Sequence, residues 1–215
     1  MSIILVVSFM LAASPSSQKI TEKCIDTSGM RTPGVLSLIE HPVRDGKDTI
    51  DVFDTQKRVI ARIYSNPSDG FVIAFVQGNH RSLTIRVYDP EYGILIFDSF
   101  EKQAGRYKVF IDGKVAYIQH RAGVTQYESW PEHIRKAPHI TTAKNPLRIA
   151  PRETSRIVAG HNQVEVYSCT EVRGDWARLK SDPQFDPGNS SGKTLEGWVQ
   201  WRKGTRLLAK IVYSD

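Results

Sequence analysis

Cysteine is scarce in this 215-residue sequence, which contains only Cys24 and Cys169. No Cys-x-x-Cys pair occurs, so the sequence has no cysteine-based zinc motif. In an oxidising compartment the two cysteines can pair, and such a bridge would stabilise the protein by about 2–4 kcal/mol. Two free thiols are the alternative, because Cys24 lies near an expected frayed end of the chain.

Long apolar runs are also missing after the first residues. The single run, Ile3–Ala13, has eleven residues, well short of the roughly 20 that cross a bilayer. Its length and the Ser-Pro-Ser-Ser that follows are typical of a secretory signal peptide, so we expect residues 1–17 to be a leader. A buried N-terminal strand is the alternative. We expect the mature chain not to be integral to the membrane.

Sustained helical periodicity is absent as well, since no segment repeats apolar residues at helical spacing over three turns. Short strand-like runs alternate with turn clusters over most of the chain. The strongest hairpin signal is Asp112-Gly113, flanked by the runs 107–111 and 115–118. The exception is residues 128–134, where a serine cap and an early proline predict a helical turn. The pattern predicts an all-β barrel or sandwich.

The charge is basic but not clustered. The net charge is +6 and the isoelectric point is about 9.3. Because the basic residues are spread along the chain, the charge indicates an ordinary solvated surface more than an anionic partner.

One short stretch occurs twice in the chain. Gly197–Gly204 reads Gly-Trp-Val-Gln-Trp-Arg-Lys-Gly, and Ala116–Gly123 repeats its Gln, Arg and Gly at the same offsets. The repetition predicts one small β unit used twice. We expect Trp176 and Trp198 to lie in a core, and Trp201 to lie at the surface or between the units, because it faces the other way along a strand.

Residues from about 142 to 213 resemble the bacterial SH3 family, also called SH3b. The family's tryptophan hairpin is matched by Gly174–Leu179 followed by Glu196–Val199. Its opening strand and its middle are matched by Asn145–Pro151 and Ile157–Val166. The resemblance implies an SH3-like β-barrel of roughly 60 residues, a size at which burial alone gives marginal stability.

The first half of the chain is similar to this family only at the two ends of residues 49–123, so the middle would be a β insertion. We therefore predict an all-β protein with two small SH3-like β-barrels in tandem, the first one divergent. The expected division is a signal peptide (1–17), an N-terminal extension (18–48), a divergent SH3b-like β domain (49–136) and an SH3b domain (142–215).

SH3b domains often accompany peptidases of the cell wall, so a cysteine peptidase is the obvious enzyme to consider. That chemistry needs a thiolate beside a histidine. Cys169 lies within the expected SH3b unit and lacks the Asp-Cys-Ser-Gly setting of the wall peptidases. His133 and His139 lack the spacing of a zinc hydrolase, and no nucleotide-binding loop occurs. We therefore expect no enzymatic activity, no metal and no cofactor.

SH3-like barrels bind extended peptides or glycans in aromatic-lined grooves. The resemblance therefore implies ligand contacts beside the polar loop 181–194 and at the matching place in the first copy: Trp201, Arg202, Asp175, Tyr117 and His120.

These features predict a non-catalytic binding module exported to the periplasm or cell surface of a bacterium, with a cell-wall peptide or an envelope protein as its partner. The alternative is an accessory scaffold subunit whose SH3b-like barrels serve protein–protein assembly only. A basic nucleic-acid binder is a third class, and export argues against it. The sequence leaves the oligomeric state open.

Overall fold

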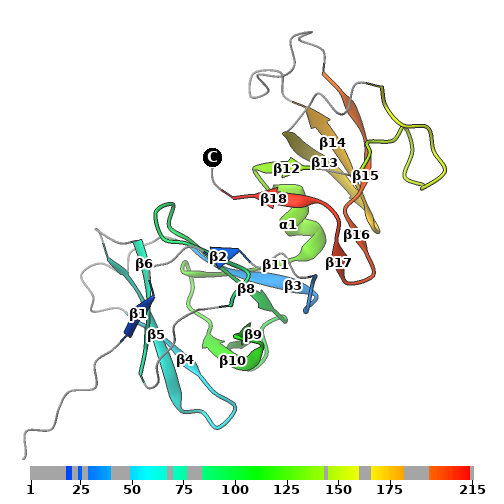
Figure 1. Cartoon of the computed structure of the whole chain (residues 1–215). Helices are drawn as coiled ribbons and strands as arrows, with labels where there is room; N and C mark the ends of the chain where they lie inside the picture. Colours follow the sequence, from blue (N-terminus) through cyan, green and yellow to red (C-terminus); the bar gives the residue numbers. More distant parts are fainter. Residues whose placement is uncertain are drawn as a thin grey trace, which may run out of the picture.

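The structure is a computed structural model that describes residues 18–20, 24–25, 29–39, 49–66, 70–76, 84–142, 145–159, 166–181 and 194–213 (Figure 1). These residues form eighteen strands and one short helix, so the predicted all-β class is confirmed. The predicted signal peptide (1–17) and most of the polar loop 181–194 lie outside the described residues.

The first sheet has eleven strands in the order β1-β6-β5-β4-β10-β9-β8-β3-β11, with β7 and then β2 attached beside β8. Three of its strands come from the predicted N-terminal extension. The strands are β1 (Gln18–Ile20), β2 (Cys24–Ile25), β3 (Gly34–Leu38), β4 (Ile50–Phe53), β5 (Val59–Asn66), β6 (Gly70–Phe75), β7 (Val87–Asp89), β8 (Ile94–Ser99), β9 (Arg106–Ile111), β10 (Lys114–Gln119) and β11 (Thr125–Ser129).

The predicted hairpin at Asp112-Gly113 is confirmed. Both turn residues have positive φ angles, 51° and 71°, which an Asp-Gly pair adopts at low cost. β9 and β10 pair from Ile111 with Lys114 to Arg106 with Gln119. Alternate residues of β9, beginning with Tyr107, are buried in a core made by the strands of this sheet and the segments that connect them.

The second sheet is antiparallel with the order β15-β14-β13-β12-β18. In both sheets the order of the described strands is open, so the tandem SH3-like barrels stay a prediction. A separate hairpin, β16–β17, lies beside the second sheet. The strands are β12 (His139–Thr141), β13 (Tyr167–Arg173), β14 (Trp176–Ser181), β15 (Glu196–Gln200), β16 (Arg202–Lys203), β17 (Arg206–Leu207) and β18 (Lys210–Val212).

The predicted helical turn is also confirmed as helix α1 (Trp130–Lys136). The Glu132 carboxylate accepts hydrogen bonds from the Ser129 backbone N–H at 2.9 Å and the Ser129 hydroxyl at 2.7 Å. These bonds lower the pKa of Glu132 below its ordinary value. Because the carboxylate lies in the first turn, its negative charge also interacts favourably with the positive N-terminal end of the helix dipole and so stabilises the helix.

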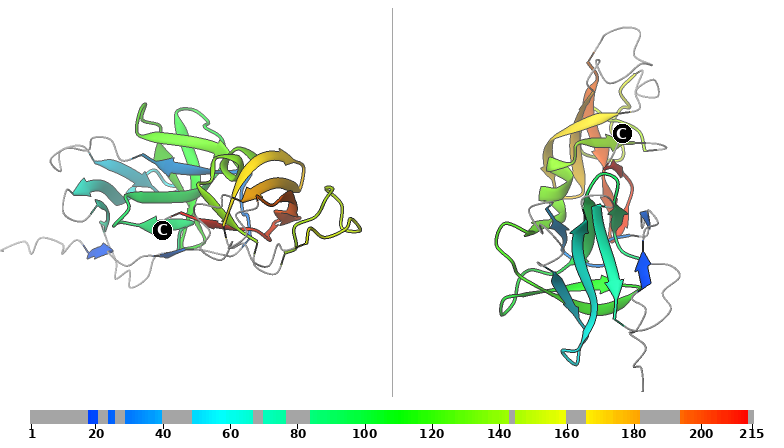
Figure 2. Two further views of the ribbon diagram at one scale, coloured as in Figure 1. Left: turned by 90° about the horizontal axis from the view of Figure 1, so that it is seen from above. Right: turned by 90° about the vertical axis from the view of Figure 1, so that its left-hand side faces the viewer.

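Helix α1 joins the two sheets into one body. It packs against β3 and β11 of the first sheet and against β13 of the second. A second buried cluster therefore mixes both sheets and the helix, with Val35 and Ile96 from the first sheet, Trp130 from the helix, and Tyr167 and Trp201 from the C-terminal part. The two views of Figure 2 show an elongated molecule with one sheet towards each end.

Two buried polar groups occupy this junction. In the first, the Arg86 guanidinium binds both oxygens of Asp98 at 2.8–3.1 Å. In the second, His133 lies between Glu128, at 2.9 Å from Nδ1, and the Tyr213 hydroxyl, at 3.0 Å from Nε2. Both ring nitrogens of His133 are thus engaged within the protein, and we assign this group a structural role.

The Glu128 carboxylate makes the junction sensitive to acid. The hydrogen bond from His133, aided by Lys136 at 2.8 Å, lowers its pKa from 4.5 to about 2. A depressed carboxyl pKa adds stability that is present above the unfolded-state pKa and is lost as the pH falls through the folded-state value.

We therefore predict that the free energy of unfolding of the wild type exceeds that of Glu128→Gln most clearly above pH 5, and that the difference shrinks between pH 4.5 and about 2. Urea unfolding at a series of pH values measures this difference. A gap between the two proteins that stays constant with pH would contradict the assignment.

Candidate binding face

The second sheet exposes a face rich in arginine and tryptophan. Along β14, Ala177, Leu179 and Ser181 are buried, whereas Arg178 and Lys180 on the opposite side are exposed. Successive side chains of a strand point to opposite faces. The outer face of the sheet therefore begins at Trp176, which is half-buried.

Strand pairing places a row of side chains across this outer face. Directly opposite residues of an antiparallel ladder point to the same side. Glu171 pairs with Arg178, and Arg178 pairs with Trp198. Trp198 exchanges two backbone hydrogen bonds with Arg148, at 2.6 and 2.7 Å, and Arg148 pairs in turn with Ile157. The Arg–Trp face is defined here as Arg148, Arg173, Trp176, Arg178 and Trp198.

Arg173 covers the ring of Trp198. Its guanidinium carbon lies 5.1 Å from the ring centroid, a cation–π distance. Trp198 is 7% exposed, yet it belongs to neither of the two buried clusters. Its burial thus comes from neighbours on the outer face. Trp198 is buried as predicted, although its ring lies on the outer side of the sheet. Trp176, also predicted in the core, is only half-buried on that side.

Two guanidinium groups of this face form only weak, solvent-exposed ion pairs within the protein. The Arg173 and Arg178 side chains are 64% and 44% exposed. Arg173 pairs with Glu171, and Arg178 pairs with Glu196 at 3.0 Å. Exposed ion pairs of this kind contribute about 0–1 kcal/mol. A carboxylate from a ligand can therefore replace the internal partner at little cost.

Trp201 lies on the inner side of the second sheet, away from the Arg–Trp face. This position is contrary to its predicted role as a ligand contact. The ring is fully buried in the second core, and its Nε1–H donates to the Gly174 carbonyl at 3.0 Å. Alternation along β15 puts Trp198 on the outer face and Val199 on the inner face, so Trp201, three residues after Trp198, points to the inner side. Trp201 thus presents no surface to a ligand, and we remove it from the binding residues.

Arg202 and Asp175 come together as the prediction required. Their side chains form an ion pair at 2.6 Å, half-exposed, next to Trp176 at the end of the Arg–Trp face. Arg202 also lies 4.8 Å above the ring of Trp201.

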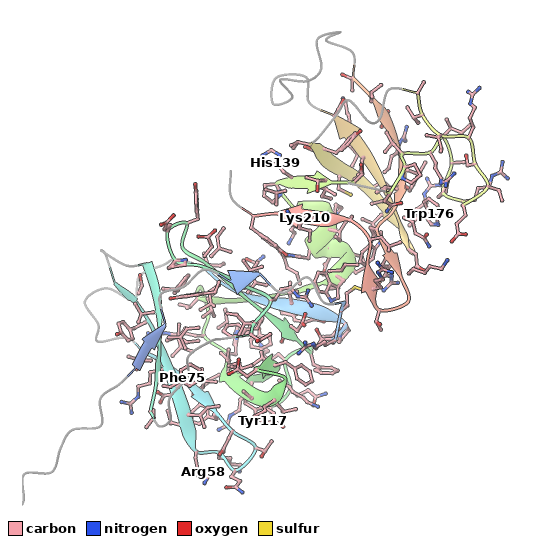
Figure 3. All side chains as sticks on the ribbon, in the orientation of Figure 1. Arg58, Phe75, Tyr117, His139, Trp176 and Lys210 are labelled. Carbon is pink, nitrogen blue, oxygen red and sulfur yellow. The ribbon has the colours of Figure 1, made fainter. Side chains whose placement is uncertain are left out.

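Tyr117 and His120 lie far from this pair. Tyr117 lies on β10 of the first sheet and His120 directly follows that strand, and Figure 3 places Tyr117 well away from Trp176. His120 Nδ1 lies 3.2 Å from the Tyr107 hydroxyl and 3.1 Å from the Thr125 hydroxyl, so it serves local structure. The five predicted contacts therefore do not form one site.

The repeated stretch has a local structural counterpart. β9–β10 and β14–β15 are both antiparallel hairpins, and the residue after the second strand bonds back to the residue before the first in each. The Trp201 N–H donates to the Asp175 carbonyl at 2.9 Å, and the His120 N–H donates to the Gly105 carbonyl at 2.8 Å. The likeness covers the hairpins only, because the sheets around them differ in strand number and order.

Cys169 lies on β13 as a free thiol. Burial raises its pKa above the ordinary value, which keeps the sulfur protonated and weakly nucleophilic at neutral pH. Its Sγ–H points to the Glu171 carbonyl at 3.4 Å. The pairing of Cys169 with Cys24 stays a prediction. The side chain of Cys24 lies outside the described residues.

Sequence reasoning missed Arg148, Arg173 and Arg178. Alternation along β14 would have found Arg178, since it stands between two buried apolar residues. Arg148 and Arg173 reach Trp198 from distant segments, which only the register of the sheet reveals.

Two further observations bear on function. Within the described ranges, no cluster of three or more His, Cys, Asp or Glu residues is placed to hold a metal ion, and the single described helix is far too short to span a membrane.

No protein-family model, curated protein or solved structure matches this chain.

Proposed function

We propose that the protein is a non-catalytic binding module of the bacterial cell envelope and that it binds cell-wall peptides through the Arg–Trp face. The proposal includes export by residues 1–17 and an SH3b-like architecture for residues 142–213, both expected from the sequence. The observation that carries it is the row of guanidinium and indole groups on the outer face of the second sheet.

The chemistry of this face fits such a ligand. Wall peptides carry carboxylates, which guanidinium groups bind with paired hydrogen bonds. They are attached to sugars, whose apolar ring faces stack on aromatic side chains. Trp176, half-buried beside the Asp175–Arg202 pair, supplies such a surface. Tryptophan and arginine are also the residues that most often dominate binding energy.

The test is retention of the full chain on purified peptidoglycan. Arg178→Glu reverses one charge on the face and is expected to weaken retention about tenfold. Trp176→Ala is expected to weaken it similarly, because it removes the exposed ring. Lys102→Glu is the matched control: it reverses a charge at an exposed site in the β8–β9 connection and should bind like the wild type.

Two results would overturn the proposal. Failure of the wild type to bind peptidoglycan, together with a stable complex with another envelope protein, would favour the scaffold alternative. Salt-dependent retention on DNA in place of peptidoglycan would favour a nucleic-acid binder.

A further inference from the structure

The first sheet contains a pocket of about 520 Å³ that lies outside the Arg–Trp face. This volume lies within the range of small-molecule sites, about 300–1,000 Å³. The ladder between β4 and β10 spans the pairs Phe53–Tyr117 and Val52–Ile118. Beyond Phe53 the two strands diverge into separate turns, and the pocket opens there. Figure 3 labels Arg58, Phe75 and Tyr117 around this region.

The floor of the pocket is apolar. It is formed by side chains from the ends of β5, β6, β9 and β10: Val59, Ile60, Phe75, Ile111, Val115 and Ala116. Phe75, Ile111 and Ala116 are buried, and the other three are partly exposed towards the opening. Such a floor favours an aliphatic or aromatic group because transfer of apolar surface out of water is favourable.

The acidic groups at the rim already have donors. Asp54 accepts hydrogen bonds from the backbone N–H groups of Gln56 and Arg58 at 2.8 and 2.9 Å, and its second oxygen binds the Arg58 side chain at 2.7–2.8 Å. These bonds lower the pKa of Asp54. Asp112 accepts the backbone N–H of Thr84 at 2.6 Å.

The basic groups at the rim keep free donors. Lys114 pairs with Ile111 through the backbone of the β9–β10 ladder, and its side chain is exposed and forms no ion pair or hydrogen bond within the described residues. The Arg58 side chain is 72% exposed despite its pair with Asp54. The hydrogen-bonding groups that remain available at the rim are therefore positively charged N–H donors. An anionic group on a ligand can accept hydrogen bonds from them.

We propose that this pocket binds a small amphiphilic anion, namely an aliphatic carboxylate whose apolar chain lies on the Phe75 side and whose head group meets Lys114. The site is independent of the Arg–Trp face, because its residues belong to the other sheet.

Calorimetric titration of the full chain with decanoate tests this site, with decylammonium and decanol as probes of head-group charge. We expect decanoate to bind at submillimolar concentration and decylammonium to bind at least tenfold more weakly. Lys114→Glu should weaken decanoate about tenfold and improve decylammonium, whereas Lys114→Arg should bind decanoate like the wild type. Val115→Trp should block both ligands, because the larger side chain fills the pocket.

Lys102→Glu again serves as the control for a charge change elsewhere and should leave decanoate binding intact. The proposal is overturned if the wild type does not bind decanoate, or if Lys114→Glu and Val115→Trp, with wild-type thermal unfolding, bind it unchanged. Arg178→Glu should weaken peptidoglycan binding about tenfold and leave decanoate binding unchanged, so failure at one site is distinguishable from failure at the other.

Discussion

Replacing Trp201 with alanine is expected to lower the free energy of unfolding by about 3–5 kcal/mol. The indole is one of the largest fully buried side chains, and it fills the core shared by both sheets and α1. Its removal leaves a cavity and also the Gly174 carbonyl without its Nε1–H donor. Urea unfolding followed by circular dichroism measures the change. The slope of the unfolding free energy against urea concentration should be the same in both proteins, which shows that unfolding remains two-state.

Trp176→Ala is the matched control for this experiment. It removes the same side chain from the outer face of the second sheet, where the ring is half-buried, and should cost about 1 kcal/mol or less. If Trp176→Ala were as destabilising as Trp201→Ala, the assignment of the inner and outer faces would be wrong.

Replacing Asp98 with alanine is expected to destabilise the protein by a comparable amount, about 3–5 kcal/mol. The Arg86 and Asp98 side chains are 2% and 5% exposed. Arg86 also donates to the Gly29 carbonyl at 2.8 Å and lies 5.1 Å from the Trp130 ring centroid. Loss of the carboxylate leaves a buried guanidinium without its counter-charge, and its desolvation is then uncompensated.

Two variants separate this effect from the loss of a side chain. The double replacement Arg86→Met with Asp98→Leu removes both charges and should recover most of the stability, since apolar substitutes often match a buried ion pair. Asp51→Ala breaks the exposed pair with Arg62, at 3.2 Å, and should cost less than about 1 kcal/mol. A loss of under 1 kcal/mol for Asp98→Ala in the same urea titrations would contradict the buried-pair account.

Local signals predicted the parts of the fold that depend on few residues. The Asp112-Gly113 turn determined its hairpin because the two residues accept positive φ angles. Ser129 and Pro131 predicted α1 because a cap and an N-terminal proline act within one turn. The strands β11 and β13 were not predicted, since their sequences Thr-Gln-Tyr-Glu-Ser and Tyr-Ser-Cys-Thr-Glu-Val-Arg lack a clear apolar alternation.

The directions of the tryptophans could not be predicted from residue type. Large aromatic side chains favour cores, so Trp176 and Trp198 were placed inside. The smaller residues Ala177 and Val199 take the inner positions instead, and guanidinium stacking encloses Trp198. The binding face needs the register between β13, β14 and β15 and the segment around Arg148. Such long-range pairing has no local signal.

The most direct test of the binding face follows the indole N–H signals of the four tryptophans by NMR during titration with soluble peptidoglycan fragments. The Arg–Trp face predicts that the signals of Trp176 and Trp198 shift with ligand concentration, while those of Trp130 and Trp201, both fully buried in the shared core, stay in place. Shifts confined to Trp130 and Trp201, or no shift at saturating ligand, would contradict it.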